Sequence, residues 1–390
     1  MENPKIRFKG FTKDWEQRKL GDVFEQTSNL VNPKEDEIEL WSLTVEDGLT
    51  KKSDRYNREF LVKKDDNFKE VRPGDIVYNP MNMTLGAVGY NGMAKSVAVS
   101  GYYTTMVAKE NYDTYYINTW LKSPQAIRLY RTYATGSLIE KQRVQFPTLS
   151  IIPVTFPKYE AQIKIGSYFH SIDNLITLHQ RKCEQTKKMK KYMLQKMFPQ
   201  NGAKVPEIRF DGFTYDWEQR KFSELYARSS EKNDGSIGMD KNITVATMQF
   251  KNDVKVSTTE YLKTYYTFKL GDIAFEGHQS KEFRYGRFVE NDIGNGIVSH
   301  IFAVFRPIQE YDLYFWKYAI NNETLMQRIL ARSTKASTMM HDLVTNDFLN
   351  ETFLVPSVKE QKQIGAFLNK LDNLITLHQR QHKLHLNMLL

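Results

Sequence analysis

The chain has 390 residues, more than one hydrophobic core usually organises, so two or more domains are expected. Lys and Arg outnumber Asp and Glu by 55 to 46, which favours a polyanionic partner such as nucleic acid, although a merely basic, solvated surface gives the same balance. A hydrophobic content of 41% excludes general disorder, and the single cysteine, Cys183, excludes an intrachain disulfide or a cysteine-based zinc site.

Targeting and membrane segments are not expected from the sequence. The amino terminus, MENPKIRFKGF, lacks the apolar core of a signal peptide. No uncharged apolar run approaches the ~18 residues that a membrane helix needs. We therefore expect a soluble protein of the cytoplasm, which also fits the low cysteine content.

The chain begins with a segment that recurs in its second half. Residues 4–20, PKIRFKGFTKDWEQRKL, match residues 206–222, PEIRFDGFTYDWEQRKF, at 13 of 17 positions. Each copy is followed by a stretch of alternating β-branched and aromatic runs broken by Gly, Asn, Asp and Pro, which is typical of short strands in a mixed domain. The sequence therefore predicts a tandem repeat of one α+β domain.

The two central stretches differ from each other apart from small landmarks. Gly74-Asp75-Ile76 corresponds to Gly271-Asp272-Ile273, and a polar, glycine-bearing loop follows each. These loops are NPMNMTLG at residues 79–86 and EGHQSKEFRYG at residues 276–286. Repeated ends around unlike middles indicate a shared scaffold with separately specialised surfaces.

Each half ends in a long predicted helix that begins just after a proline, Pro157 or Pro356. The string DNLITLHQR occurs in both helices, at residues 173–181 and 372–380. Apolar residues and histidines recur there at steps of four and three, the seam of a coiled coil; the seam comprises Ile165, Phe169, Ile172, Ile176, His179 and Cys183 in the first helix, and Ile364, Leu368, Leu371, Ile375, His378, His382, His385 and Leu389 in the second.

The expected architecture follows from these two helices. We expect domain 1 at residues 1–157, a first coil helix at 158–198, domain 2 at 199–356, and a second coil helix at 357–390 that is about two turns shorter. Because neither stripe can be covered by a small domain, antiparallel packing of the helices is expected, with a pseudo-two-fold axis and the globular domains at opposite ends. Two independent helices, each capping its own domain, are the alternative.

No catalytic constellation is apparent. GYNGMAKS at residues 89–96 has Ala94 where a phosphate-binding loop requires glycine, and Asn79-Pro80-Met81-Asn82 lacks the second proline and the aromatic residue of an aminomethyltransferase motif. A nuclease carboxylate cluster and a serine nucleophile elbow are also lacking. The seam histidines have ligand-like spacing, but they lack an accompanying acidic ligand, so core or partner-facing histidines are the preferred interpretation and no metal is expected.

These features together resemble the specificity (S) subunit of a type I restriction–modification enzyme over essentially the whole chain. The resemblance depends on the opener DWEQRKLGD at residues 14–22, the GDI landmarks, the pattern P-x-x-x-E-Q-x-x-I-G at residues 356–365, and the two IDNLITLHQR or LDNLITLHQR segments. The first half departs from the pattern because Ala161 replaces the glutamate found at Glu360.

The resemblance implies two target recognition domains that each read one half of a bipartite, asymmetric DNA sequence, and a chain that is itself not an enzyme. It also implies that the coil docks two modification subunits and that restriction subunits complete the complex. S-adenosylmethionine, ATP and Mg would then bind to those partners, with no cofactor in this chain. The coil residues assigned to partner binding are Ile165, Phe169, Ile172, Ile176, His179, Ile364, Leu368, Leu371, Ile375 and His378.

Base recognition needs polar and aromatic side chains on loops that reach the grooves, while Lys and Arg hold phosphates. The candidates for DNA contact are Asn79, Asn82, Thr84, Tyr102, Tyr103, Lys141, Gln142 and Arg143 in the first domain, and His278, Gln279, Lys281, Arg284 and Tyr285 in the second. Two alternatives remain open: a nuclease or methyltransferase that is active by itself, and a coiled-coil interaction protein without a DNA role.

Overall fold

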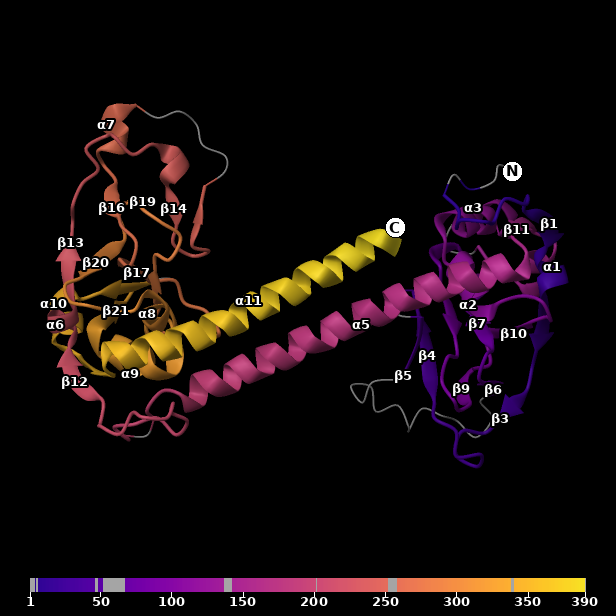
Figure 1. Cartoon of the computed structure of the whole chain (residues 1–390), viewed down its shortest axis with the longest axis horizontal. Helices are drawn as coiled ribbons and strands as arrows, with labels where there is room; N and C mark the ends of the chain where they lie inside the picture. The colour runs from indigo at the N-terminus through magenta and orange to yellow at the C-terminus, as the bar shows by residue number, and fades with distance from the viewer. Residues whose placement is uncertain are drawn as a thin grey trace. The chain divides into compact units, whose positions relative to one another are not determined.

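The computed structural model describes residues 4, 6–45, 48–51, 67–136, 142–200, 202–251, 258–337 and 340–389. The chain divides into two compact units (Figure 1). Unit 1 consists of Met1–Thr177 with Leu384–Leu390, and unit 2 consists of Leu178–Lys383. Each unit has its own sheets and its own hydrophobic cores.

Unit 1 contains a four-stranded antiparallel sheet with the strand order β2-β10-β7-β8, a three-stranded sheet β3-β6-β9, and the pairs β4-β5 and β1-β11. The strands are β1 (Glu16–Lys19), β2 (Phe24–Thr27), β3 (Leu30–Val31), β4 (Trp41–Thr44), β5 (Gly48–Lys51), β6 (Phe68–Val71), β7 (Ile76–Tyr78), β8 (Val88–Tyr90), β9 (Val97–Ser100), β10 (Thr104–Ala108) and β11 (Pro153–Phe156). The helices are α1 (Leu20–Val23), the 3-10 turn η2 (Met83–Leu85), α2 (Thr114–Leu121), α3 (Pro124–Tyr133), α4 (Phe146–Ser150) and the start of α5 (Tyr159–Lys196).

Unit 2 repeats the main sheet with the order β13-β20-β17-β18 and adds the pairs β12-β23, β14-β15, β16-β19 and β21-β22. The strands are β12 (Glu218–Lys221), β13 (Tyr226–Ser229), β14 (Ile243–Thr244), β15 (Gln249–Phe250), β16 (Tyr266–Phe268), β17 (Ile273–Glu276), β18 (Arg287–Glu290), β19 (Gly296–Val298), β20 (Ala303–Pro307), β21 (Thr334–Ala336), β22 (His341–Leu343) and β23 (Thr352–Val355). The helices are α6 (Phe222–Leu225), η4 (Met239–Lys241), α7 (Thr259–Leu262), α8 (Leu313–Ile320), α9 (Glu323–Ser333), α10 (Thr345–Asn350) and α11 (Val358–Leu389).

The central strand of each main sheet separates two hydrophobic clusters. In β7, Ile76 and Tyr78 belong to the cluster that contains Met106, whereas Val77 belongs to the cluster that contains Val99. Successive side chains of a strand point to opposite faces, so a strand buried on both faces must be apolar throughout. This explains the short unbroken apolar runs that follow both Gly-Asp landmarks.

The Gly-Asp landmark itself is a turn that leads into the central strand. Gly74 has a φ of +90°, the left-handed region that glycine adopts without strain, and Asp75 accepts a hydrogen bond from the Arg72 N–H at 3.0 Å. Asn91 closes the turn, because its side-chain amide donates to the carbonyls of Val71 and Lys95. The polar stretch that follows β8 is therefore part of a turn rather than a phosphate-binding loop.

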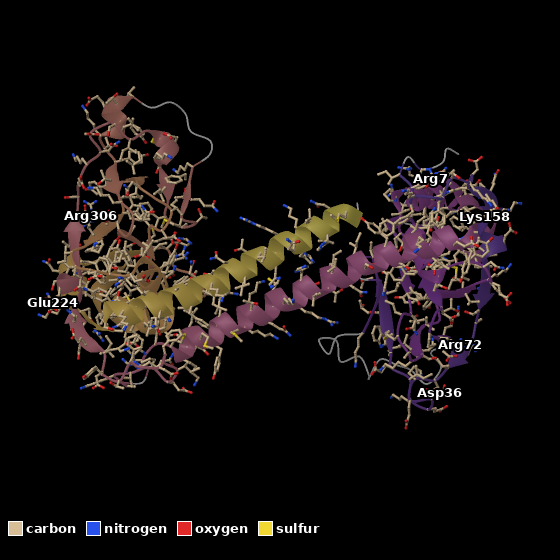
Figure 2. The ribbon with its side chains drawn as sticks, viewed as in Figure 1. Arg7, Asp36, Arg72, Lys158, Glu224 and Arg306 are labelled. Carbon is tan, nitrogen blue, oxygen red and sulfur yellow. The ribbon has the colours of Figure 1, made fainter. Side chains whose placement is uncertain are left out.

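Unit 2 repeats this turn with the equivalent residues. Asp272 accepts from the Lys269 N–H at 2.8 Å, and Asn291 donates to the Phe268 and Gly294 carbonyls. Arg306 of β20, labelled in Figure 2, adds a bidentate ion pair to Asp272, at 3.0 and 2.9 Å. The same hydrogen-bonded turn therefore precedes the central strand, β7 or β17, in each unit.

The start of each long helix is locked to its own unit by glutamine and glycine. Gln162 accepts a hydrogen bond from the Asp113 N–H at 3.0 Å and donates to the Pro157 carbonyl at 2.8 Å. A Cβ on Gly166 would lie 2.4 Å from the Asp113 Oδ1 atom, so only glycine fits there. Gln361 and Gly365 repeat both contacts against Asp312 in unit 2, which gives a physical reason for the Gln-x-x-Ile-Gly spacing.

Within unit 2, α5 and α11 pack against each other in antiparallel orientation. The Nδ1 atoms of His179 and His378 lie 3.1 Å apart, and further along α5 the Lys190 ammonium pairs with Asp372 at 2.6 Å. Residue numbers rise along one helix as they fall along the other, so the predicted antiparallel coil and the predicted α+β internal repeat are confirmed.

Candidate nucleic-acid interface

The loop after β7 is held in shape by its own hydrogen bonds. The Asn79 side-chain oxygen accepts from the Met81 N–H at 3.0 Å, and the Asn79 carbonyl accepts from the Asn82 N–H at 3.0 Å. Met83 is fully buried and anchors the loop to the core. Asn82 lies exposed at its tip, while Asn79 is half-buried. The loop therefore presents a small, rigid set of polar groups.

Thr84, also among the residues predicted to contact DNA, lies on the inner side of this loop. Its side chain is only 8% exposed, and its carbonyl accepts a hydrogen bond from the Arg131 side chain at 3.4 Å. Thr84 therefore supports the loop from beneath and does not present its hydroxyl at the surface.

The tyrosine pair lies in the turn between β9 and β10. Tyr102 is 88% exposed, whereas Tyr103 is half-buried. In the β10–β7 register Thr104 is opposite Tyr78, so Tyr103 and Asn79 follow at the same end of the sheet. Strand pairing thus brings together two segments that are about 20 residues apart in sequence.

The third predicted segment of unit 1 lies beside the same loop. Thr135 and Arg143 form a two-way backbone pair, and the Val144 N–H donates to the Pro80 carbonyl at 2.9 Å. Arg143 is exposed and Gln142 is half-buried, whereas Lys141 lies outside the described residues. The candidates Asn79, Asn82, Gln142 and Arg143 are therefore brought to one edge of the unit.

In unit 2, the loop that follows β17 is longer and richer in cations. The Ser280 hydroxyl accepts from the Glu282 and Phe283 N–H groups, which makes a turn that exposes Gln279 and Lys281. The Arg284 N–H donates to the Glu323 carboxylate at 3.2 Å. The guanidinium carbon of Arg284 lies 5.5 Å from the centre of the Tyr285 ring. This cation–π arrangement keeps the Arg284 charge at the surface.

The hairpin β21–β22 packs against this loop. His278 pairs with Met340, and the His341 N–H donates to the Gly277 carbonyl at 2.8 Å. The rings of Tyr285 and His341 lie edge to face at 5.4 Å. The loop and the hairpin therefore form one surface that carries His278, Gln279, Lys281, Arg284 and Tyr285 together.

Charges at the base of this surface are already paired within the unit. Arg287 bonds to Glu276 at 2.7 Å and to the Ala246 carbonyl at 2.8 Å. On the neighbouring strands, Arg306 and then Lys269 lower the pKa of Glu231 to about 2, which keeps that carboxylate ionised at neutral pH. Arg287 therefore stabilises the fold through contacts within the unit, whereas Lys281 and Arg284 are exposed at the surface.

A family model for the type I restriction modification DNA specificity domain matches residues 12–188 and again residues 215–387. The chain belongs to this family. The two matched ranges coincide with the two copies of the internal repeat, and this specificity subunit therefore carries one family domain in each half. Members of the family are not themselves catalytic, and their role is the recognition of DNA sequence.

The fold is that of a solved S subunit. The type I restriction–modification S subunit from M. genitalium matches with a TM-score of 0.61 and 14% identity, covering 100% of this chain and 97% of that one. The HsdS subunit from Thermoanaerobacter tengcongensis matches with a TM-score of 0.47 and 14% identity, covering 97% and 96%. No curated protein is significantly similar in sequence.

The hairpin of unit 2 is the part of the specificity subunit's candidate surface that sequence reasoning missed. Residues 334–343 were not among the candidates, yet His341 and the exposed Lys335 lie on the hairpin that borders the predicted loop. An offset of 199 maps Thr135 onto Thr334, so the candidates around Arg143 could have pointed to this segment. The signal was the repeat and not the local sequence.

The coil residues of the specificity subunit are used mainly inside the chain. Ile172, Ile364, Leu368 and Leu371 are buried; Ile165, Phe169, Ile176, His179, Ile375 and His378 are half-buried. The helices expose other apolar side chains at equivalent places of the repeat, Leu178 at 44% and Leu377 at 48%. Leu178 and Leu377 are therefore exposed apolar side chains of the two helices outside the predicted seam.

Metal ligands and membrane-spanning helices were both considered for the described residues. Within the described ranges, no three side chains of His, Cys, Asp or Glu lie close enough together to hold a metal ion. Among the same residues, no helix is both long and apolar enough to span a membrane.

Proposed function

We propose that this chain is the DNA-recognition subunit of a type I restriction–modification system and that it reads a bipartite, asymmetric site. The observation that carries the proposal is the pair of unlike loops, residues 79–86 and 276–286, on equivalent edges of a repeated scaffold. A common scaffold with different loops suits two half-sites of different sequence. Unit 1 would read one half-site and unit 2 the other.

The side chains on the two surfaces suit different parts of a duplex. Amide groups such as those of Asn82 and Gln279 can donate and accept at one base edge, as adenine recognition in the major groove requires. Lys281, Arg284 and Arg143 are cations that can bind phosphates, and such contacts fix the register without reading sequence. Tyr102 can pack on sugar or base surfaces.

The coil is proposed as the scaffold for the other subunits. Two modification subunits would dock on the helices, and restriction subunits would complete the complex in the cytoplasm. The methyl transfer from S-adenosylmethionine and the ATP- and Mg-dependent steps would belong to those partners, so that this chain contributes specificity and holds no cofactor. The exposed Leu178 and Leu377 support an apolar docking surface on the helices.

Two measurements test the proposal. Anisotropy titrations of the chain with its modification partner should show duplex binding that weakens steeply as salt rises, because phosphate contacts release counterions. Absence of duplex binding at low salt would favour an interaction protein without a DNA role, and binding that does not respond to salt would exclude phosphate contacts as its source. Separately, the chain alone with S-adenosylmethionine and DNA should give no methylated bases; methylation without a second polypeptide would show that the chain is itself an enzyme.

A further inference from the structure

The turn between β9 and β10 in unit 1 and the turn between β19 and β20 in unit 2 have the same geometry. In residues 100–103 the Tyr103 N–H donates to the Ser100 carbonyl at 3.0 Å, and in residues 299–302 the Phe302 N–H donates to the Ser299 carbonyl at 3.1 Å. This is the hydrogen bond between the first and fourth residues of a β-turn. Because the two segments are again 199 residues apart, they are copies of one element.

The fourth residue anchors each turn to a hydrophobic core. Tyr103 packs on the cluster that contains Val99, and Phe302 packs on the cluster that contains Val304. In unit 1 the turn is also fixed by β6, because the Lys69 ammonium donates to the Tyr103 carbonyl at 2.8 Å. Each turn is therefore held against its own scaffold.

The third residue of each turn is large, apolar and exposed. Tyr102 is 88% exposed and Ile301 is 74% exposed. Single exposed apolar side chains are common on protein surfaces, but these two occupy the same position of a repeated turn. Because so little of either side chain is buried, the fold itself gains little stability from it.

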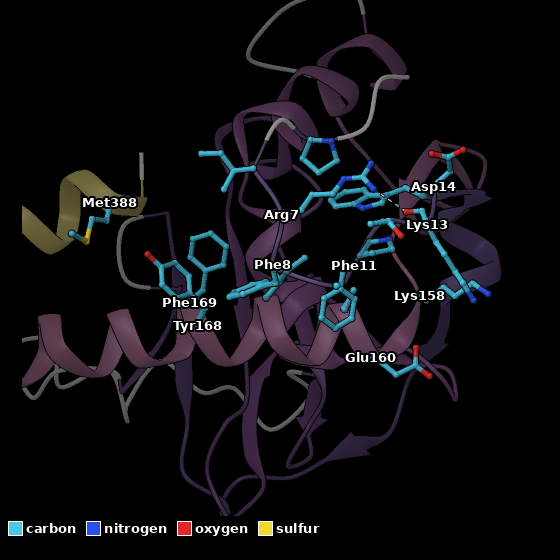
Figure 3. A pocket seen from close by; sticks show the side chains of 18 residues that line it. Arg7, Phe8, Phe11, Lys13, Asp14, Lys158, Glu160, Tyr168, Phe169 and Met388 are labelled. Carbon is cyan, nitrogen blue, oxygen red and sulfur yellow. Dashed lines mark hydrogen bonds between the residues drawn. The ribbon is translucent and has the colours of Figure 1, made fainter.

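Exposed aromatic residues beside α5 partly cover one another instead. Phe8 and Tyr168 pack edge to face with ring centres 6.1 Å apart, and the Tyr168 and Phe169 rings lie 5.6 Å apart (Figure 3). Phe8 is 42% exposed and Tyr168 is 49% exposed. At 88% exposure, Tyr102 leaves much more of its ring accessible than these packed aromatic residues do.

Strand pairing places each turn beside the polar loop of its unit. In unit 2, Ala303 of β20 is opposite Phe275 of β17, so the turn and Glu276 follow at the same end of the sheet. Tyr103 and Asn79 have the same relation in unit 1. Glu276 and Asn79 are the first residues of the two loops proposed to contact DNA, so each exposed apolar side chain extends that surface.

We propose that Tyr102 and Ile301 contact base pairs in the major groove, each in the half-site that its own unit reads. The inference rests on the proposed function and adds an apolar contact to its polar ones. The Ile301 side chain has no hydrogen-bond donor, so it is unsuited to a phosphate. Apolar side chains read the major groove through thymine methyl groups, and the neighbouring Asn82 and Gln279 carry amides that suit base edges in the same groove.

The first test is an anisotropy titration of the chain, in complex with its modification partner, with a duplex that carries the site mapped by methylation. Ile301→Ser should weaken binding at least about tenfold, because the contact buries an isoleucine side chain. The slope of affinity against salt should stay unchanged, since an apolar contact releases no counterion. Ile301→Leu should restore most of the affinity. The matched control Ile308→Ser, at the other end of β20 and 55% exposed, should bind as the unchanged chain does.

The second test maps methylated bases in cells that express the same complexes. Ile301→Ser should relax the sequence at about one or two base pairs of one half-site, and Tyr102→Ser should do so in the other half-site. Tyr215→Ser, at 87% exposure, is the matched control for Tyr102→Ser and should leave the sequence unchanged.

The possible results separate this inference from the proposed function. Unchanged affinity of Ile301→Ser, or an unchanged sequence in both half-sites, would overturn the inference while the proposed function stands. Failure of Ile301→Ser to assemble with the modification subunits in the absence of DNA would overturn it in favour of a protein contact. If the unchanged complex binds no duplex at low salt, the proposed function fails and the inference fails with it.

Discussion

Removal of the Glu360 carboxylate should destabilise unit 2 severely. Its side chain is 2% exposed and binds the Arg209 guanidinium through two hydrogen bonds, at 2.7 and 2.8 Å. The Trp217 indole N–H donates to the same carboxylate at 3.3 Å. Glu360→Ala leaves the half-buried Arg209 guanidinium without its carboxylate and the buried Trp217 N–H without an acceptor, so a loss of roughly 3–5 kcal/mol is expected.

An exposed ion pair in the same unit provides the control. Glu224, on α6, pairs with Arg220 at 3.0 Å, but the Glu224 side chain is 49% exposed. Water screens such a pair, so Glu224→Ala should cost less than about 1 kcal/mol. The double variant Arg209→Met with Glu360→Leu removes both charges together and should recover most of the stability that Glu360→Ala loses.

Hydrogen exchange measured by mass spectrometry resolves where the stability is lost. Under native conditions, Glu360→Ala should accelerate exchange in the first turns of α11 and in residues 208–217, while exchange in unit 1 stays unchanged. If Glu360→Ala and Glu224→Ala have equal effects, the ion pair does not anchor the helix and the reasoning is refuted. The reverse change, Ala161→Glu, should protect residues 6–15 of unit 1 by giving Arg7 a carboxylate.

Further predictions concern a buried acid, a helix contact and the DNA surface. Burial raises the pKa of Glu290 well above its ordinary value; as pH rises past the unfolded pKa, the unfolded state loses its proton while the folded state keeps it, so stability falls by up to about 1.4 kcal/mol per pH unit. Glu290→Gln should remove that slope in denaturation curves from pH 5 upward and have little effect below pH 4; a slope that persists would contradict the assignment. Gly166→Ala would press its Cβ against the Asp113 carboxylate and should cost about 1–3 kcal/mol in thermal unfolding, with the exposed Ser167→Ala as control; equal melting temperatures would exclude the close contact. Lys281→Ala should lower the salt slope of DNA binding by about 1, whereas an unchanged slope would exclude a phosphate contact at Lys281.

The repeat made much of the fold predictable. Two copies of a nine-residue string fixed the helices and their apolar faces, and the apolar run after Gly74-Asp75 indicated a central strand. We could predict antiparallel packing because the apolar stripe of each long helix must be buried against another element. These inferences succeed since they depend on periodicity, which is a property of local sequence.

The candidate surface was less predictable because strand pairing and loop packing create it. Nothing in the sequence shows that Thr84 points inward while Asn82 points outward, as both lie in the same polar loop. His341 contacts Gly277 although it lies 64 residues further along the chain, in a hairpin outside the loop. The coil seam was visible, but periodicity cannot tell whether a stripe faces its own chain or a partner, and here Leu368 and Leu371 are buried within the unit.

The most direct test of domain-by-domain DNA reading is a domain exchange followed by mapping of methylated bases. Residues 23–157 would be replaced by the equivalent segment of another specificity subunit, and the complex with modification subunits would be expressed in cells whose genome is then sequenced for methylation. The account predicts a new sequence in one half-site, with the other half-site unchanged. A change in both half-sites, or in neither, would contradict it.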